Sequence, residues 1–235
     1  MFISTKHRTE AEEIMDDFEL QGPELMDALD KIAFINKVLG GNQLTIQGLK
    51  HLLAGRSLQK ITIVDVGCGN GDMLRVLADG ALQQHIELDL IGIDANPFTI
   101  TYAEKLSENY TNIRYRCEDI FGDSFQELQC DVVLCTLTLH HFSNRQIEKL
   151  LTVFCQQSRL GVIINDLHRS GVAYRLFQLF SFVFKLNRMS REDGLTSILR
   201  GFTKSELVRF SKQLPITKQS IRWRWAFRYQ WIIWN

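Results

Sequence analysis

The sequence predicts a doubly wound α/β domain with a mostly parallel sheet. Short apolar runs alternate with amphipathic stretches through the middle of the chain, as they do when helices connect successive strands of a parallel sheet. The apolar runs occupy residues 61–66, 86–93, 113–117, 132–135 and 160–165, and helical periodicity appears in 73–78, 97–109 and 144–157. The runs are apolar at nearly every position, which indicates strands that helices cover on both faces.

The N-terminal part is expected to form a helical cap over residues 1–58, followed by the α/β domain over residues 59–235. Apolar residues recur at helical spacing between positions 14 and 39, and the glycine pair 40–41 favours a helix end. A second helix is expected at residues 44–53. This helix would lead the chain into the sheet.

The C-terminal part begins with a capping box, Thr203-Lys-Ser-Glu206, that opens a helix to about residue 212. Residues 221–231 then alternate between two sides, which predicts a half-buried strand or hairpin that finishes the sheet by antiparallel pairing. The aromatic side carries Trp223, Trp225, Phe227, Tyr229 and Trp231, and the polar side carries Arg222, Arg224, Arg228 and Gln230.

The composition favours a globular protein without a strong charge preference for its partners. The 235 residues contain 27 basic and 27 acidic side chains, so we expect neither nucleic acid nor an anionic membrane as partner. Five cysteines without a Cys-x-x-Cys pair predict reduced thiols, and the start of the chain carries no apolar signal core. We therefore expect a cytoplasmic protein without a membrane span, and a homodimer is left open.

The most informative stretch is Asp65-Val-Gly67-Cys-Gly69-Asn-Gly71, between the first expected strand and the next helix. Its glycines allow a tight turn and let a ligand approach the backbone amides at the helix start. Asp94 ends the second expected strand, 23 residues after Gly71. An acid at this place can accept hydrogen bonds from both ribose hydroxyls, so the sequence predicts a nucleoside-binding loop.

The loop departs from the dinucleotide-binding fingerprint G-x-G-x-x-G, because Asp72 stands at its third glycine position. A negative side chain is a poor neighbour for pyrophosphate, and Asp65 likewise favours a ligand with a cationic centre and no phosphate. At these residues the chain resembles the class I S-adenosylmethionine (SAM)-dependent methyltransferases, whose hallmark is an acid followed closely by G-x-G-x-G. The resemblance covers about residues 61–166. It implies a Rossmann-like methyltransferase fold with seven strands, SAM as the cofactor and S-adenosylhomocysteine as its product.

The cofactor-binding residues that this resemblance implies lie after the first four strands of the expected sheet. They are Asp65, Gly67, Gly69 and Gly71 at the methionine part, Asp94 at the ribose, Ala95, Asp119 and Ile120 at the adenine, and Thr136 beside the cofactor.

The flanks resemble a subgroup of small-molecule methyltransferases, some of them encoded beside polyketide-type synthases. Residues 13–17, 35–41, 165–170 and 200–203 carry this second resemblance. It implies methyl transfer from SAM to a small, largely apolar acceptor, for which we expect a hydroxyl of an aromatic or polyketide-like molecule. Carboxylate, amine and carbon acceptors remain open.

Three histidines are candidate bases for this transfer, and His168 is the preferred one. His168 follows the fifth expected strand at the carboxyl edge of the sheet, where ligands bind, and an ordinary histidine pKa of about 6.5 suits proton removal near neutrality. Asp166 would orient this imidazole or its neighbour, and His140 and His141 follow the fourth strand at the same edge. A base helps without being obligatory, because alignment of acceptor and methyl lowers the barrier by itself. We find no metal-ligand spacing and expect no metal.

An insertion at about residues 170–200 is expected to cover the acceptor site. Residues 172–186 are apolar around nearly the whole helix circumference, which fits either a core helix or a lid over an apolar pocket. The candidate substrate-binding residues are Arg169, Tyr174 and Arg200. Arg200 would bind an acidic or phenolate group, or would pair with a carboxylate of the protein.

Three other functions were weighed on the same residues. A nicotinamide-dependent oxidoreductase is disfavoured by Asp72 and by the long spacing to Asp94. Methylation of RNA or protein would need a basic groove or a recognition domain, and residues 136–139 replace the N/D-P-P-Y tetrapeptide of amine methylation. A catalytically idle SAM-binding protein that acts through a partner remains open.

Overall fold

The computed structural model describes residues 4–81, 86–215 and 218–234. Within these residues the strands form one seven-stranded sheet in the order β3-β2-β1-β4-β5-β7-β6. β1 to β5 pair in parallel, and β7 runs antiparallel to both of its neighbours, β5 and β6. The predicted doubly wound, mostly parallel sheet with an antiparallel C-terminal finish is confirmed.

The five apolar runs of the sequence are the five parallel strands. They are β1 (Lys60–Val66), β2 (Glu87–Asp94), β3 (Ile113–Cys117), β4 (Cys130–Thr136) and β5 (Ser158–Leu167). The alternating tail is a hairpin of β6 (Gln219–Arg224) and β7 (Arg228–Trp234). The hairpin, one of the two arrangements that the tail allowed, is therefore the observed one.

The connecting helices begin where the sequence carries capping residues. The Asn96 side chain accepts a hydrogen bond from the Thr99 amide at 2.9 Å, and Thr203 forms its capping box with Glu206. The connecting elements are α3 (Asp72–Val76), η2 (Leu77–Ala81), α4 (Pro97–Leu106), α5 (Asp123–Gln126), η3 (Leu139–His141), α6 (Asn144–Gln157) and α9 (Lys204–Ser211).

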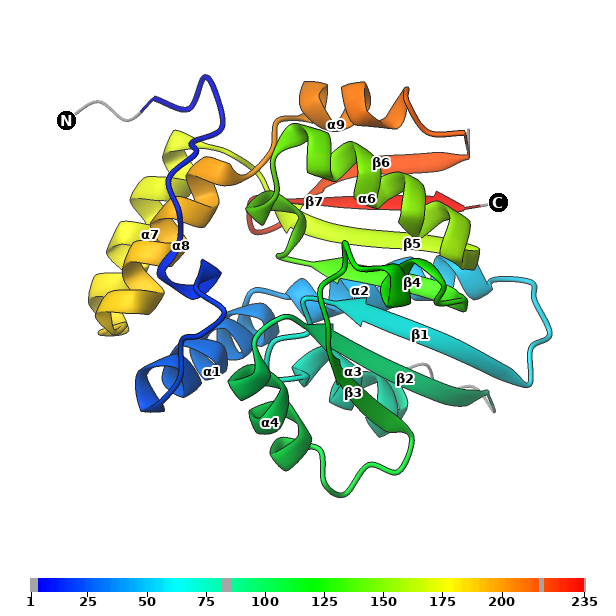
Figure 1. Cartoon of the computed structure of the whole chain (residues 1–235). Helices are drawn as coiled ribbons and strands as arrows, with labels where there is room; N and C mark the ends of the chain where they lie inside the picture. Colours follow the sequence, from blue (N-terminus) through cyan, green and yellow to red (C-terminus); the bar gives the residue numbers. More distant parts are fainter. Residues whose placement is uncertain (1–3, 82–85, 216–217, 235) are drawn as a thin grey trace.

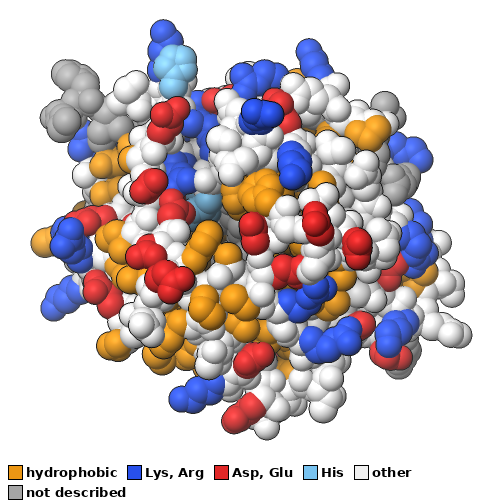
Figure 2. All heavy atoms as spheres, viewed as in Figure 1, with side chains coloured by type: hydrophobic (Ala, Val, Ile, Leu, Met, Phe, Trp, Pro, Cys, Tyr) orange, Lys and Arg blue, Asp and Glu red, His pale blue; other side chains and the backbone are white. Residues whose placement is uncertain are grey.

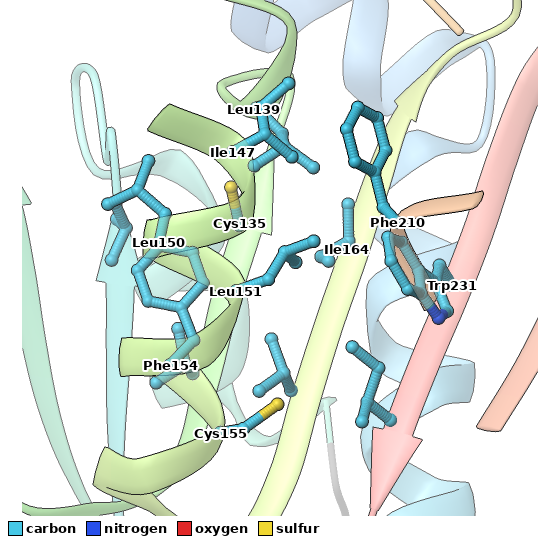
Figure 3. Packing of buried hydrophobic residues seen from close by; sticks show 14 of the residues in the cluster. Cys135, Leu139, Ile147, Leu150, Leu151, Phe154, Cys155, Ile164, Phe210 and Trp231 are labelled. Carbon is cyan, nitrogen blue, oxygen red and sulfur yellow. The ribbon is translucent and has the colours of Figure 1, made fainter. Parts of the chain in front are cut away.

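One face of the sheet is covered by α6 and α9. Figure 3 shows Leu151 and Phe154 of α6 pointing toward β4 and β5, with Phe210 of α9 and Trp231 of β7 completing the cluster. These side chains are at most 1% exposed. Burial of apolar area of this size is the main force that holds the helices on the sheet.

The other face is covered by α2 (Gly41–Leu53) and α3, and α2 lies unusually close to the strands. A Cβ atom on Gly48 would lie 2.9 Å from Cγ2 of Ile163 in β5, so only glycine fits at this contact. The helix ends at Leu53, as the sequence indicated, but its tight packing makes it part of the layer that covers the sheet.

The polar side of the tail is a correction to the sequence analysis. Arg228 and Gln230 were placed on the exposed side of a half-buried strand, yet both are 2% exposed. β7 lies inside the sheet, and helices cover its polar face as well as its apolar one. Arg228 donates to Oδ1 of Asn36 at 2.7 Å, and Gln230 donates to the carbonyl of Leu44 at 2.6 Å, so these polar groups tie the strand to the N-terminal helices.

A helical cap lies beyond the carboxyl ends of the parallel strands (Figure 1). It comprises α1 (Pro23–Val38), α7 (Gly171–Val183) and α8 (Arg188–Arg200), together with residues 4–22, which we call the N-terminal strap. The strap is not helical from residue 14 as the periodicity suggested, since it forms only the short 3₁₀ turn η1 (Ile14–Asp16). The cap and the strand ends enclose the main cavity.

Candidate active site

A cavity of about 1140 Å³ lies between the cap and the carboxyl ends of the strands. Its walls come from the glycine loop, from the ends of β2 and β4, from α1, α7 and α8, and from the strap. Pockets of this size hold a nucleoside-sized ligand together with a second small molecule. The position agrees with the rule that doubly wound sheets bind ligands at the carboxyl ends of their strands.

The loop after β1 requires glycine for two different reasons. Gly67 has φ +68°, and a Cβ atom there would lie 2.4 Å from Oγ1 of Thr138. Gly69 has φ +53°, and its missing side chain leaves the loop open toward Leu29 of α1. Backbone with positive φ and no side chain lets a ligand lie directly on the loop.

A buried carboxylate, Asp65, and a partly buried one, Asp94, flank this loop. Asp94 accepts hydrogen bonds from the amides of Gly69 at 3.2 Å and Asn96 at 3.0 Å, which holds its carboxylate at the end of β2. Asp65 is 3% exposed, and its Oδ1 atom has no hydrogen-bond partner in the described part of the chain. Burial, with Asp72 and Asp94 nearby, raises the pKa of Asp65 well above its ordinary value. A cationic ligand would relieve both the missing hydrogen bond and the excess of negative charge.

Most of the predicted cofactor-binding residues lie on this cavity. Its lining contains Asp65, Gly67, Gly69, Asp94, Ala95, Asp119, Ile120 and Thr136. Gly71 does not line it: this residue begins α3 with φ +77°, and a Cβ atom there would lie 2.0 Å from the Tyr115 hydroxyl oxygen. Gly71 therefore shapes the turn behind the site.

A histidine of η3 and an aspartate of β5 form a buried pair in the cavity wall. Nδ1 of His140 lies 2.7 Å from Oδ1 of Asp166, whose Oδ2 accepts the backbone amide of His140 at 3.1 Å. His140 is 2% exposed and its Nε2 atom has no hydrogen-bond partner among the described residues. Burial alone would raise the pKa of Asp166, but the facing imidazole and the hydrogen bonds lower it overall. The ionised carboxylate thus fixes the tautomer in which Nε2 can accept a proton.

His141 has a similar partner that comes from the strap. Its Nδ1 atom lies 2.6 Å from Oδ1 of Asp16. Arg200 donates to the other oxygen of Asp16 and to the carbonyls of both histidines. Arg200 lines the cavity, but its guanidinium is paired with a carboxylate of the protein, and it holds the strap against the two histidines.

Glu13 is the strap residue that reaches farthest into this cluster. One of its oxygens, Oε1, lies 3.6 Å from Nε2 of His140, and the other accepts the Ser197 hydroxyl at 2.7 Å. Burial raises the pKa of Glu13 to about 7, although His141, Ser197 and Arg200 act in the opposite direction. The sequence analysis used this segment only as part of a resemblance, because nothing in the sequence places residue 13 beside residue 140.

Glu13, His140 and His141 could also hold a metal ion, which their spacing in the sequence did not suggest. One ligand atom from each lies within 4.8 Å of the others. The two carboxylates behind the histidines resemble the outer partners of metal-bound imidazoles. Arg200, however, lies 3.7 Å from Oε1 of Glu13 and already supplies a positive charge at that oxygen.

His168 also lines the cavity, but its surroundings differ from those of His140. Its Nδ1 atom accepts a hydrogen bond from the Trp223 indole at 3.2 Å, and Asp166 pairs with His140 instead of with His168. Burial, with Arg169 nearby, lowers the pKa of His168. The Asp166 carboxylate thus orients the imidazole of His140 in η3, and not that of His168.

Two of the predicted substrate-binding residues do not reach the cavity. Arg169 is 3% exposed and donates to the carbonyls of Thr5 and Gly201 and to Glu206 at 2.8 Å. Tyr174 lies on α7 but is not among the residues that line the cavity. The apolar part of the wall comes instead from Phe177, Phe180 and Ile198 of the cap and from Trp225 of the hairpin turn.

Comparison with known proteins agrees with this geometry. Residues 63–159 match a family described as methyltransferase domain. Carboxy-S-adenosyl-L-methionine synthase of Helicobacter pylori (strain J99 / ATCC 700824) is 28% identical over 123 residues, which are 52% of this chain. The alignment spans about half, 49%, of that relative's length.

Solved structures share the fold over most of the chain. The plantazolicin methyltransferase BpumL in complex with SAH has a TM-score of 0.67 and 18% identity, covering 88% of this chain and 89% of that one. The magnesium protoporphyrin IX methyltransferase ChlM from Synechocystis PCC 6803 with bound SAM has a TM-score of 0.52 and 14% identity, covering 83% and 80%.

The fold is therefore the Rossmann-like methyltransferase fold that the sequence predicted, and residues 63–159 match a methyltransferase domain. The strap and the α7–α8 segment lie outside the matched residues.

Proposed function

We propose that this protein transfers a methyl group from SAM to a hydroxyl of a small, largely apolar molecule. The observation that carries the proposal is the cavity itself, which joins an acidic glycine loop to an apolar wall with His140 between them. The acids favour a sulfonium cofactor over a dinucleotide, because a pyrophosphate would meet Asp72 and the buried Asp65. SAM, when bound, supplies the activated methyl group.

Asp65, Asp94 and the glycine loop would hold the cofactor. Asp94 would accept hydrogen bonds from the ribose, since its carboxylate is fixed at the end of β2 by two backbone amides. Ala95, Asp119 and Ile120 would surround the adenine. Asp65 would balance the positive charge of the methionine part.

His140 is the proposed base. Asp166 keeps the proton of the neutral imidazole on Nδ1, so Nε2 takes the proton that the acceptor hydroxyl loses when its oxygen bonds to the methyl carbon. SAM would supply the methyl carbon, and the electron pair of the broken sulfur–carbon bond would remain on its sulfur, which would become a neutral thioether. Phe177, Phe180 and Ile198 would hold the apolar body of the acceptor, and Glu13 and His141 would face its polar end.

The test combines binding and product analysis. Calorimetry should detect S-adenosylhomocysteine and no NAD, and mass spectrometry with isotope-labelled SAM and a set of phenols should detect a labelled methyl product. Binding of NAD without binding of S-adenosylhomocysteine would refute the cofactor. SAM binding without turnover of any phenol, carboxylate or amine would favour the idle SAM-binding protein. A carboxylated SAM product would instead point to the chemistry for which the Helicobacter relative is named.

A further inference from the structure

The outer face of α7 carries an exposed apolar stripe that the proposed reaction does not use. Val172, Leu176, Leu179 and Val183 follow one another at helical spacing and are 50–60% exposed. Phe182, beside them, is 81% exposed. The sequence of this helix fits either a core helix or a lid, and in the structure only one of its faces is packed.

This stripe lies next to the cavity. The opposite face of α7 contributes Phe177 and Phe180 to the cavity wall, and Leu176, half exposed, belongs both to the stripe and to the wall. Figure 1 places α7 and α8 at the end of the molecule beyond the carboxyl ends of the strands, and Figure 2 shows hydrophobic side chains at the surface on that side. The apolar surface and the acceptor site are therefore continuous.

Exposed basic side chains occur in the same segment of the chain as the stripe. No acidic residue occurs from Leu167 to Arg191, whereas this segment contains Arg175, Lys185, Arg188 and Arg191, all exposed. The first acid, Glu192, pairs with Arg188 at 3.1 Å. An apolar helical face with Phe and Leu, flanked by Lys and Arg, is the pattern of a helix that lies in the interface of an anionic bilayer.

We propose that α7 docks this protein on the surface of an anionic lipid bilayer, with Leu179 and Phe182 inserted among the acyl chains. No helix in the described residues is long and apolar enough to cross a membrane, and interfacial docking requires no such helix. The net charge of the whole chain is zero, but residues 167–191 carry an excess of positive charge. A second copy of the chain fits the stripe less well than a lipid surface does, because a symmetric contact would bring the basic residues of both copies together.

Docking in this orientation would open the apolar wall of the cavity toward the lipid. An acceptor with a hydrocarbon tail could then pass along Leu176 to His140 without crossing water. This consequence rests on the proposed methyl transfer, whereas the docking itself does not.

The test is co-sedimentation of the full chain with vesicles, measured without SAM or acceptor. The wild type should bind vesicles of phosphatidylcholine and phosphatidylglycerol, less so at high salt, and should bind pure phosphatidylcholine weakly. The double variant Leu179→Glu with Phe182→Glu should lower the partition coefficient about tenfold or more. Lys185→Glu should lower binding to the anionic vesicles only.

The matched control is Val208→Glu on α9, which is 36% exposed and lies on a helix that covers the sheet outside the cap. It should bind vesicles like the wild type, and calorimetry of S-adenosylhomocysteine binding should verify that every variant is folded. Failure of the wild type to bind anionic vesicles would overturn the proposal, as would equal binding by the double variant. A wild-type dimer that the double variant dissociates, without vesicle binding, would assign the stripe to self-association.

Discussion

Nδ1 of His140 lies 2.7 Å from Oδ1 of Asp166, a residue of the neighbouring strand β5. This contact determines which ring nitrogen can act as a base, since the carboxylate accepts the Nδ1 proton and leaves Nε2 as the acceptor. Strand register produces the contact: Thr136 at the end of β4 pairs with Asn165, so the residues just beyond these positions meet at the edge of the sheet.

Asp166→Asn should therefore lower kcat while leaving cofactor binding intact. An asparagine amide can donate to Nδ1, which would place the ring proton on Nε2 and remove the base. We expect kcat to fall by about 10²–10⁴-fold, the usual contribution of a positioned base. The measurement is turnover of any phenol that the wild type methylates, with the Kd of S-adenosylhomocysteine as control. Unchanged turnover would show that the transfer needs no oriented base at this position.

His168→Ala separates the two candidate bases. The Nδ1 atom of His168 is occupied by the Trp223 indole, and the imidazole lacks a carboxylate partner among its described hydrogen bonds. We expect kcat of His168→Ala to fall by less than about tenfold, against a loss of about 10²-fold or more for His140→Ala. The reverse order of the two losses would restore His168 as the base.

Asp94→Asn tests the cofactor site. The loss of a charged acceptor for ribose hydroxyls is worth roughly 1.5–3 kcal/mol, which corresponds to about a 10–150-fold rise in the Kd of SAM. The matched control is Asp89→Asn on the same strand, whose carboxylate pairs with Arg114 at 2.8 Å on the surface. Calorimetry with equal affinities for the wild type and Asp94→Asn would contradict the assignment of the glycine loop to SAM.

The sequence was sufficient to predict the sheet, because buried parallel strands are apolar at nearly every position and Asn96 and Thr203 mark helix starts. It was also sufficient for the cofactor side of the cavity, since the glycine loop and Asp94 lie next to strands that the pattern identifies. Local signals of this kind depend only on a residue's own neighbours along the chain.

The acceptor side could not be predicted in the same way. Glu13 and Asp16 reach the histidines only because the strap folds back across the cap, and no periodicity encodes that contact. Asp166 had two histidines within reach, and only the register of β4 against β5 selects His140. Arg228 and Gln230 resembled exposed residues because the pattern of β7 does not reveal that α1 and α2 cover its polar side.

Comparison of Gly67→Ala with Gly55→Ala should separate the cost of backbone strain from the cost of a steric clash. Both glycines have positive φ, +68° at Gly67 and +73° at Gly55. A Cβ atom at Gly55 would have no neighbour within 4 Å, whereas a Cβ atom at Gly67 would lie 2.4 Å from the Thr138 side chain. We expect Gly55→Ala to lower the free energy of unfolding by about 1–2 kcal/mol and Gly67→Ala by about 1–3 kcal/mol more. Urea denaturation measures both, and equal losses would mean that the loop can shift away from Thr138.

Glu13→Gln should change how stability depends on pH. The pKa of Glu13 is raised from 4.5 to about 7, so between these values the folded state holds a proton that the unfolded state has released. The free energy of unfolding of the wild type should therefore fall as pH rises from about 4.5 to about 7, and should receive no further penalty from this group above that range. Glutamine does not ionise, so the free energy of unfolding of Glu13→Gln should not show this decrease.

The advantage of Glu13→Gln over the wild type should thus increase by about 1–3 kcal/mol between pH 4.5 and pH 7, whatever the two stabilities are at the lower pH. Urea denaturation across this range provides the comparison. The neighbouring variant Glu12→Gln is the control, because Glu12 is exposed and its substitution should leave the pH dependence as it is in the wild type. Parallel pH profiles for Glu13→Gln and the wild type would mean that Glu13 ionises freely, and therefore that the strap does not bury it against His140 in solution.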